Sequence, residues 1–322
     1  MLTSHMDIAT KHLPFLHDVQ SGLGQFPKRL PSKYFYDDIG SQIFQEIMEM
    51  PEYYLTNAEH EILRDQAAEL IDAVGFAGQF SLVELGAGDG AKTKSLLQHL
   101  VDRGRKVVYR PVDISAKAVE LLEADFRQDL PELEIQSLVG DYFEVLEAVD
   151  LGPDPALFLF LGSNIGNYET PAAIELLQHF GEFMRPGDKM LVGFDLKKQP
   201  ETILKAYGDP HGITARFNLN LLTRMNRELG TNFDPGQFLF YPSYNPHTGE
   251  VRSCLVSLVE QSVYLPATDQ TFSFNAFETI ATELSKKYSL REIEALAEQS
   301  GFRFHTHVLD SRRYFSDSLW EK

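Results

Sequence analysis

Three glycines stand close together in the segment Glu84-Leu-Gly-Ala-Gly-Asp-Gly90, directly after the apolar run Phe80–Leu85. Glycine allows a sharp backbone turn and lets a ligand come close to the main chain. In doubly wound sheets, ligands bind outside the carboxyl ends of the strands, which is where this segment would lie. Its spacing, G-x-G-x-G, differs from the G-x-G-x-x-G of dinucleotide-binding proteins. The segment therefore predicts either a small-molecule site or an ordinary strand-to-helix turn.

Acidic residues follow the next two expected strands and could complete a nucleoside site. Asp113 ends the second strand, and its carboxylate could accept two hydrogen bonds from a ribose diol. Asp141 and Tyr142 follow the third strand and could bind an adenine amine and its ring face. Glu84 suits a ligand that carries positive charge, as S-adenosylmethionine does. Each aspartate alone is better explained as a loop carboxylate or a helix cap, but the three elements in this order favour a class I methyltransferase over these structural roles. A dehydrogenase remains the main rival for this fold.

Alternating strands and helices surround these motifs. This alternation predicts a doubly wound, mostly parallel α/β sheet, a Rossmann-like fold with a terminal antiparallel hairpin. Ser115 is the expected N-cap of the second helix. The expected strands are Phe80–Leu85, Lys106–Val112, Leu133–Val139, Ala156–Leu161, Lys189–Phe194, Phe302–Leu309 and Tyr314–Trp320, and the expected helices are Ala91–Leu100, Ala116–Phe126, Thr170–Met184 and Leu290–Ser300.

A change of pattern after the fifth strand predicts a second domain. We expect a methyltransferase domain over residues 1–196 and 287–322, interrupted by a substrate-binding α+β domain over 197–286. Residues 1–79 look largely helical, and we expect them to flank or cover the site. Within the insertion we expect a helix at Gly212–Leu229, a loop rich in Pro, Gly and Tyr at Asp234–Glu250, and strands within Val251–Tyr264 and Thr271–Phe277.

Composition narrows the classes of partner. The chain of 322 residues carries 47 acidic and 29 basic residues, and its formal charge of −18 repels nucleic acids and anionic lipid surfaces. The single cysteine, Cys254, can form no internal disulfide. No apolar stretch has the length of a membrane span or the pattern of a signal peptide. We expect a soluble, cytoplasmic monomer that binds a small-molecule substrate and neither nucleic acid nor membrane.

The segment Leu161-Gly-Ser-Asn-Ile-Gly-Asn167 follows the fourth strand, where methyltransferases of this architecture place residues that face the substrate. Asn167 offers both a donor and an acceptor to the ammonium or carboxylate of an amino acid. Beside Gly166 it suits a structural turn equally well.

Six segments occur in order along nearly the whole chain: Ser32–Ser41, Pro51–Tyr54, Glu84–Gly90, Phe160–Asn167, Phe217–Asn220 and Thr282–Ser285. Together they closely resemble the histidine-specific Nα-methyltransferase family of ergothioneine biosynthesis. That family consists of a methyltransferase domain interrupted by a second domain, which agrees with the expected insertion. The resemblance implies an enzyme that uses S-adenosylmethionine to trimethylate the α-amino group of L-histidine, giving hercynine and S-adenosylhomocysteine.

The resemblance also implies the residues of the site. We expect Tyr53, or a water that it holds, to accept the amine proton, and Asn167 to orient the amine lone pair. His305 and His307 share a strand face, but the sequence offers no third ligand nearby, so no metal is expected. The implied methyl-donor contacts are Tyr36, Gly86, Lys92, Asp113, Asp141 and Tyr142; the implied acceptor contacts are Tyr53, Asn167 and Tyr207 around the α-amino and carboxylate groups and Glu283 and Ser285 on the imidazole.

The choice of acceptor depends on few residues. Glu283 and Ser285 are two positions apart, so on an extended strand they lie on one face and could hold both imidazole nitrogens. Without the resemblance, Glu283 is better explained as a surface ion pair with Lys286 or Lys287. Ser253 is smaller than the apolar residue that the family suggests there, which leaves room for other amino acids. The alternatives are therefore an Nα-methyltransferase of another amino acid, such as a tryptophan derivative, and a non-catalytic S-adenosylmethionine-binding module.

Overall fold

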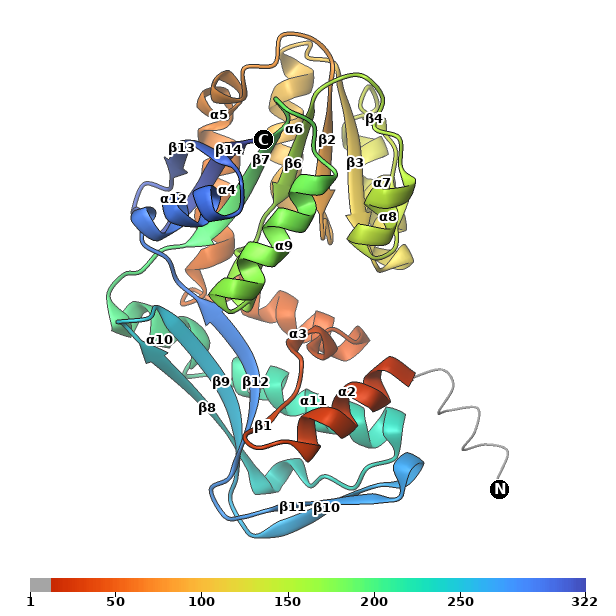
Figure 1. The fold of residues 1–322 in the computed structure, drawn as a ribbon, viewed down its shortest axis with the longest axis vertical. Coiled ribbons are helices and arrows are strands. Elements are labelled where there is room, and N and C mark those ends of the chain that lie inside the picture. The colour runs from red at the N-terminus through yellow and green to blue at the C-terminus, as the bar shows by residue number, and fades with distance from the viewer. Residues whose placement is uncertain (1–12) are drawn as a thin grey trace. The chain divides into compact units, whose positions relative to one another are not determined.

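The computed structural model describes residues 13–322, which form two compact units (Figure 1). The insertion unit contains Lys198–Ser285 and the described residues up to Tyr54. The sheet unit contains Leu55–Lys197 and Lys286–Lys322. Among the described residues, no helix is both long enough and apolar enough to cross a bilayer.

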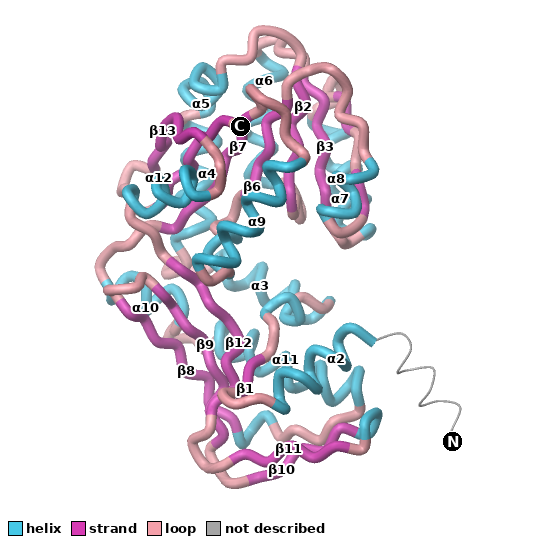
Figure 2. Tube along the Cα trace, viewed as in Figure 1, coloured by secondary structure: helices cyan, strands magenta, loops and turns pink. Residues whose placement is uncertain are grey.

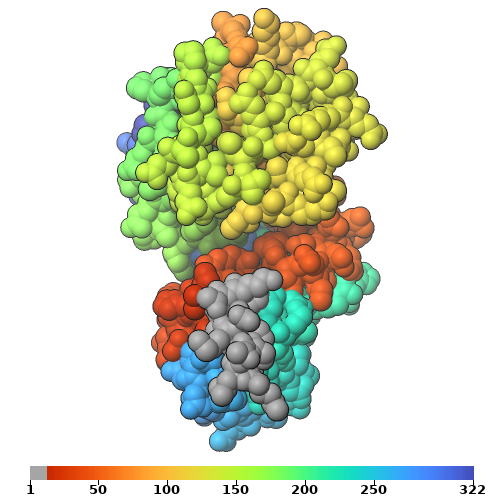
Figure 3. Space-filling view, turned by 90° about the vertical axis from the view of Figure 1, so that its right-hand side faces the viewer, coloured from red at the N-terminus to blue at the C-terminus, as the bar shows by residue number. Residues whose placement is uncertain are grey.

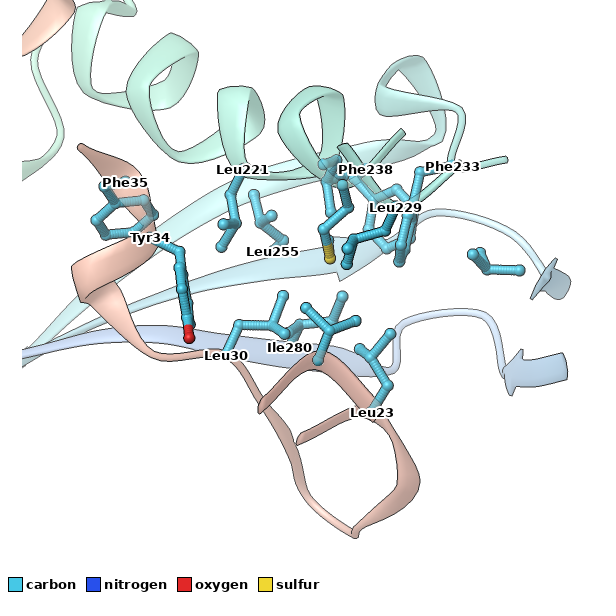
Figure 4. Packing of buried hydrophobic residues seen from close by; sticks show 14 of the residues in the cluster. Leu23, Leu30, Tyr34, Phe35, Leu221, Leu229, Phe233, Phe238, Leu255 and Ile280 are labelled. Carbon is cyan, nitrogen blue, oxygen red and sulfur yellow. The ribbon is translucent and has the colours of Figure 1, made fainter. Parts of the chain in front are cut away.

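The N-terminal flank is divided between the two units, which differs from the expected assignment of residues 1–79 to the methyltransferase domain. Leu23, Leu30 and Phe35 are buried in the same core as Leu221 and Leu229 of the insertion (Figure 4). Helical periodicity shows that a segment has an apolar face but not which distant core that face joins. The described residues 13–54 therefore belong to the insertion unit.

The sheet unit is a doubly wound α/β domain. Its strands run in the order β13-β14-β7-β6-β2-β3-β4, with β5 also beside β3. The pairs are parallel except for those that β14 makes with β7 and β13. The class I methyltransferase fold with a terminal antiparallel hairpin is thus confirmed. The strands are β2 (Phe80–Leu85), β3 (Val107–Asp113), β4 (Glu134–Ile135), β5 (Leu138–Val139), β6 (Ala156–Phe160), β7 (Lys189–Asp195), β13 (Arg303–Leu309) and β14 (Phe315–Glu321).

Helices flank this sheet (Figure 2). Every residue of β2 and β6 is buried, as expected of strands covered on both faces. Ser115 caps α7 as expected, since its side chain accepts a hydrogen bond from the Ala118 amide. The expected third strand, Leu133–Val139, is divided into two short strands, β4 and β5. The helices are α4 (Tyr54–Asp65), α5 (Ala67–Val74), α6 (Ala91–Asp102), α7 (Ala116–Asp129), α8 (Tyr142–Ala148), α9 (Thr170–Glu182) and α12 (Leu290–Gln299), with the short 3-10 turn η2 (Asn164–Asn167).

The insertion unit is an α+β domain. A 4-stranded sheet has the order β1-β12-β9-β8, and β10 pairs with β11 in a separate hairpin. Leu221 and Leu229 of α11 pack against Leu255 and Ile280 of the larger sheet (Figure 4). The elements are α2 (Leu13–Gly24), β1 (Lys28–Arg29), η1 (Ser32–Phe35), α3 (Asp38–Glu49), α10 (Pro200–Tyr207), α11 (Ile213–Leu229), η3 (Pro235–Gln237), β8 (Phe238–Asn245), β9 (Glu250–Ser257), β10 (Gln261–Leu265), η4 (Pro266–Thr268), β11 (Gln270–Phe274) and β12 (Thr279–Lys286).

The expectation of a loop over Asp234–Glu250 is wrong for half of that segment, because it contains β8. Pro242 lowers the strand signal, since proline lacks the amide hydrogen that a central strand needs. β8 is at the edge of its sheet, where only one side of the strand must pair, and Pro242 lies opposite Ser253 of β9. The edge position accommodates the proline.

Candidate active site

The glycine turn follows β2 in the sheet unit. Gly86, Gly88 and Gly90 all have left-handed backbone angles, with φ of 73°, 58° and 66°. The amides of Gly86 and Ala87 both donate to the carbonyl of Val112, at 2.9 and 3.1 Å, which anchors the turn to the end of β3. A Cβ at Gly86 or Gly88 would meet no atom within 4 Å, so this side of the turn is open to a ligand.

Gly90 has a different role, which gives a stability prediction. A Cβ there would lie 2.8 Å from Leu122 Cδ1 and 3.0 Å from Phe126. Gly90→Ala combines a left-handed backbone cost of about 1–2 kcal/mol with overpacking of about 1–3 kcal/mol, so it should lower the free energy of unfolding by about 2–5 kcal/mol. Gly104→Ala is the matched control, because Gly104 has φ of 64° and open space around it. Urea unfolding that gives equal losses for both variants would contradict the packing role of Gly90.

Asp113 links the turn to the next helix. Its Oδ2 accepts a hydrogen bond from the Gly88 amide at 2.9 Å, and its Oδ1 accepts one from the Ser115 amide at 2.8 Å. The carboxylate is partly exposed, and each oxygen keeps a second lone pair that a hydroxyl can use. Asp113 can therefore hold the turn and a diol at the same time.

Asp141 is the N-cap of α8, and Tyr142 is the first residue of that helix. Figure 3 colours this part of the chain, between about residues 100 and 150, yellow to yellow-green. Asp141 caps the helix by accepting from the Phe143 amide at 3.0 Å, so the cap predicted as its alternative role is present. Burial, with smaller contributions from Tyr168 and Asp141, raises the pKa of Tyr142 to about 12. Tyr142 stays a neutral hydroxyl on a half-buried ring that packs on Phe180. An open glycine turn, a diol acceptor and an aromatic ring fit the nucleoside of a methyl donor.

Lys92, on the first turn of α6, forms an ion pair with Glu59 of α4. Glu59 is 1% exposed, and its other oxygen accepts the Gly162 amide at 2.7 Å. Burial alone would lower the pKa of Lys92, but the charge and hydrogen bond of Glu59 raise it, so the lysine stays charged. Burial and the Glu59 charge also raise the pKa of Asp317 well above its usual range.

Sequence reasoning missed Glu59, although a signal for it exists. Leu55, Ala58, Ile62 and Leu63 are the buried stripe of α4, and Glu59 falls within this stripe at helical spacing. A buried charged residue on an apolar helix face requires a charged or hydrogen-bonding partner. That partner is Lys92, a predicted donor contact.

The sequence suggested that Glu84 could contact a positively charged ligand. In the structure it has other partners. Its side chain is buried, and its two oxygens accept hydrogen bonds from the hydroxyls of Thr93, at 2.6 Å, and Tyr109. The carboxyl therefore joins β2 to α6 and β3. Burial raises its pKa to about 7, against the opposing effect of the two hydrogen bonds.

The raised pKa of Glu84 predicts a pH-dependent stability. Between the unfolded value of 4.5 and about 7 the folded state holds the proton more tightly, so this contribution to stability is full below pH 4.5 and is lost as the pH rises to about 7. Glu84→Gln cannot titrate. The stability of the wild type relative to this variant should fall by about 3 kcal/mol between pH 4.5 and 7, at about 1.4 kcal/mol per pH unit. Urea unfolding profiles that run parallel over this range would contradict the prediction.

The insertion unit brings together most of the predicted acceptor residues. Tyr207 and Ser285 are buried, and their hydroxyl oxygens are 2.8 Å apart. The ring of Tyr53 packs edge-on against Tyr207 at a centroid distance of 6.4 Å. Glu283 lies two residues before Ser285 on β12, and its Oε2 accepts a hydrogen bond from the hydroxyl of Ser253 at 3.2 Å. The cluster offers hydroxyls, a carboxylate and aromatic rings.

Tyr36, a predicted donor contact, belongs to the same unit. Its ring packs edge-on against Phe44 and Phe217, at 5.3 and 5.7 Å. The residue keeps 49% of its surface exposed, so these contacts cover only part of the ring. The donor contacts predicted in sequence are thus distributed over both units.

The surface alternative assigned Lys286 or Lys287 as the partner of Glu283. Lys286 donates to Thr170 Oγ1 at 2.6 Å, and Lys287 pairs with Asp195 at 2.9 Å. Both lysines therefore have other partners within the sheet unit.

Asn167, exposed at the end of η2, also lies in the sheet unit. His307 contacts Ser318 at 2.8 Å, and the described residues contain no group of three or more potential metal ligands.

Comparisons with known proteins place the chain in a family. Histidine N-alpha-methyltransferase of Mycobacterium tuberculosis is 37% identical over 91% of this chain and 90% of its own length. Ergothioneine biosynthesis protein 1 of Neurospora crassa is 31% identical over 85% of this chain and 31% of its own length. The 4-dimethylallyltryptophan N-methyltransferase of Trichophyton verrucosum is 26% identical, with 88% of this chain and 86% of the relative covered. Because residues 15–322 also match the model of the histidine-specific, S-adenosylmethionine-dependent methyltransferases, the chain belongs to this family and is a methyltransferase that uses S-adenosylmethionine.

Proposed function

We propose that this enzyme trimethylates the α-amino group of L-histidine, giving hercynine and S-adenosylhomocysteine, a step of ergothioneine biosynthesis. The observation that carries the proposal is the cluster of Tyr53, Tyr207, Glu283 and Ser285 in the insertion unit. The names of the mycobacterial and Neurospora relatives support the same substrate and pathway.

On the donor side, the proposal assigns the nucleoside to the glycine turn, Asp113, Asp141 and Tyr142. Lys92 would donate to the carboxylate of the donor's amino-acid part while it stays paired with Glu59, because an ammonium has three hydrogens to donate. Tyr36 is a further proposed contact. The bound donor supplies an electrophilic methyl group on a sulfonium. Alignment and exclusion of water are then the main tasks of the protein.

On the acceptor side, the imidazole N–H would donate to Glu283, and Ser285 would hold the other ring nitrogen. Asn167, Tyr53 and Tyr207 would hold the α-amino and carboxylate groups. In each transfer an N–C bond forms as the S–C bond breaks, so the amine must be neutral. One proton leaves before each of the three transfers, and the final quaternary ammonium carries none. Tyr53, or a water held by it, would accept these protons.

Acceptor choice can be tested directly by incubating the purified protein with S-adenosylmethionine and each of the twenty amino acids, followed by mass spectrometry. We expect histidine to gain three methyl groups and the other amino acids to gain few or none. Preferential methylation of tryptophan would instead favour the substrate class named for the Trichophyton relative. Methylation of no amino acid would contradict both acceptors.

A further inference from the structure

The main chain leaves the sheet unit after Lys197 and returns to it at Lys286. The two crossing segments lie side by side. Leu196 and Tyr288 form a parallel bridge, the Tyr288 amide donates to the Asp195 carbonyl at 2.9 Å, and the Lys197 amide donates to the Tyr288 carbonyl at 2.9 Å. The exit and the return of the insertion are thus held together within the sheet unit.

A buried ion pair joins the side chains of these segments. Lys287 Nζ lies 2.9 Å from Asp195 Oδ2, and both side chains are 0% exposed. Removing two charges from water is costly, so such a pair adds little net stability compared with apolar side chains of similar size. A buried pair of this kind can instead fix the relative position of the two segments that it joins.

The same segments contact the motif that ends in Asn167. The Asp195 amide donates to the Ser163 hydroxyl at 3.0 Å. Gly166 packs so tightly on the return segment that a Cβ there would lie 2.7 Å from the Lys286 carbonyl oxygen. Lys286 Nζ also donates to Thr170 Oγ1, directly after the motif. The motif is therefore held near both of its ends.

We propose that Asp195 and Lys287 are positioning residues for the acceptor. Their ion pair fixes the crossing segments, whose contacts with Ser163 and Gly166 set the position of Asn167 within the sheet unit. This inference rests on the proposed function, in which Asn167 contacts the amino acid. Neither Asp195 nor Lys287 belongs to the glycine turn or to the other proposed donor contacts of the sheet unit, so donor binding should not depend on the pair.

Lys287→Met and the double variant Asp195→Asn/Lys287→Met test the proposal. The double variant leaves no uncompensated buried charge, so it keeps the test valid where the single variant is too unstable. We expect kcat/KM for histidine to fall about 10- to 100-fold, the scale of a misplaced reacting group, while the calorimetric dissociation constant of S-adenosylhomocysteine changes less than about twofold. The control is Lys189→Met, which breaks a mostly buried pair with Glu321 at the other end of β7 and should leave histidine kinetics unchanged.

Gly166→Ala perturbs the same contact from the motif side, and its φ is not left-handed. It should lower kcat/KM for histidine with little change in donor affinity. A folded double variant with wild-type histidine kinetics, or equal losses of donor and acceptor binding, would overturn the proposal. Asn167→Ala separates the two hypotheses: unchanged histidine kinetics in that variant would remove the assigned acceptor contact itself, whereas a loss there without a loss in the ion-pair variants would remove only the positioning role.

Discussion

Glu283→Ala is expected to weaken histidine binding by about 1.5–3 kcal/mol, or about 10- to 150-fold, and to narrow the preference for histidine over tryptophan. The lost interaction is a charge-assisted hydrogen bond from the imidazole N–H to a carboxylate. The Ser253 hydroxyl, which donates to this carboxylate, loses its acceptor at the same time. An amino acid without the imidazole donor makes no such bond, so its affinity should change less.

Ser285→Ala is the matched control on the same strand face. It removes a neutral hydroxyl 2.8 Å from the Tyr207 hydroxyl and should cost only about 0.5–1.5 kcal/mol of histidine affinity. If Glu283 were a solvated surface residue, its removal would change affinity by about 0–1 kcal/mol, as for exposed ion pairs. Competition between histidine and tryptophan decides between these ranges, and an unchanged preference in Glu283→Ala would contradict the imidazole contact.

Asp113→Ala is expected to reduce the affinity for S-adenosylhomocysteine by about 1–3 kcal/mol, or about 5- to 150-fold. The variant loses the proposed acceptor of the ribose diol. It also leaves the amides of Gly88 and Ser115 without their shared partner, which loosens the glycine turn. Isothermal titration calorimetry measures the effect.

Asp150→Ala controls for the loss of a loop carboxylate. Asp150 is exposed, and its side chain accepts a local hydrogen bond from the Gly152 amide at 2.8 Å. Donor affinity should stay within about twofold of the wild type in this variant. Equal affinities for the Asp113→Ala and Asp150→Ala variants would remove Asp113 from the donor site.

The parts of the fold that could be predicted from sequence depend on local patterns. Every residue of β2, β6 and β7 is buried because both faces of these strands are covered, and Ser115 marks the start of its helix by a short-range hydrogen bond. β8 was missed because its edge position, which accommodates Pro242, is set by distant strands. The core into which residues 13–54 pack is likewise formed by segments far away in the sequence.

The same distinction applies to the site. The glycine turn and Asp113 could be identified from sequence because each ends a strand, and the carboxyl ends of parallel strands lie at one edge of the sheet. The pairing of Lys92 with Glu59 joins different helices, and the pairing of Lys287 with Asp195 joins segments separated by the whole insertion. No local spacing specifies such partners. The position of Glu84 before the glycines suggested a contact with a cation. Its side chain instead lies in the core, because hydroxyls of β3 and α6 donate to it.

The proposed reaction transfers three methyl groups to the α-amino nitrogen of L-histidine. The most direct test is to incubate the enzyme with L-histidine and S-adenosylmethionine labelled with ¹³C in its methyl group, and to examine the product by NMR. We predict one resonance from three equivalent methyl groups on a quaternary nitrogen bonded to the α-carbon, with both imidazole nitrogens unmethylated. Label on an imidazole nitrogen, or no label on histidine under conditions in which another amino acid is methylated, would contradict the claim.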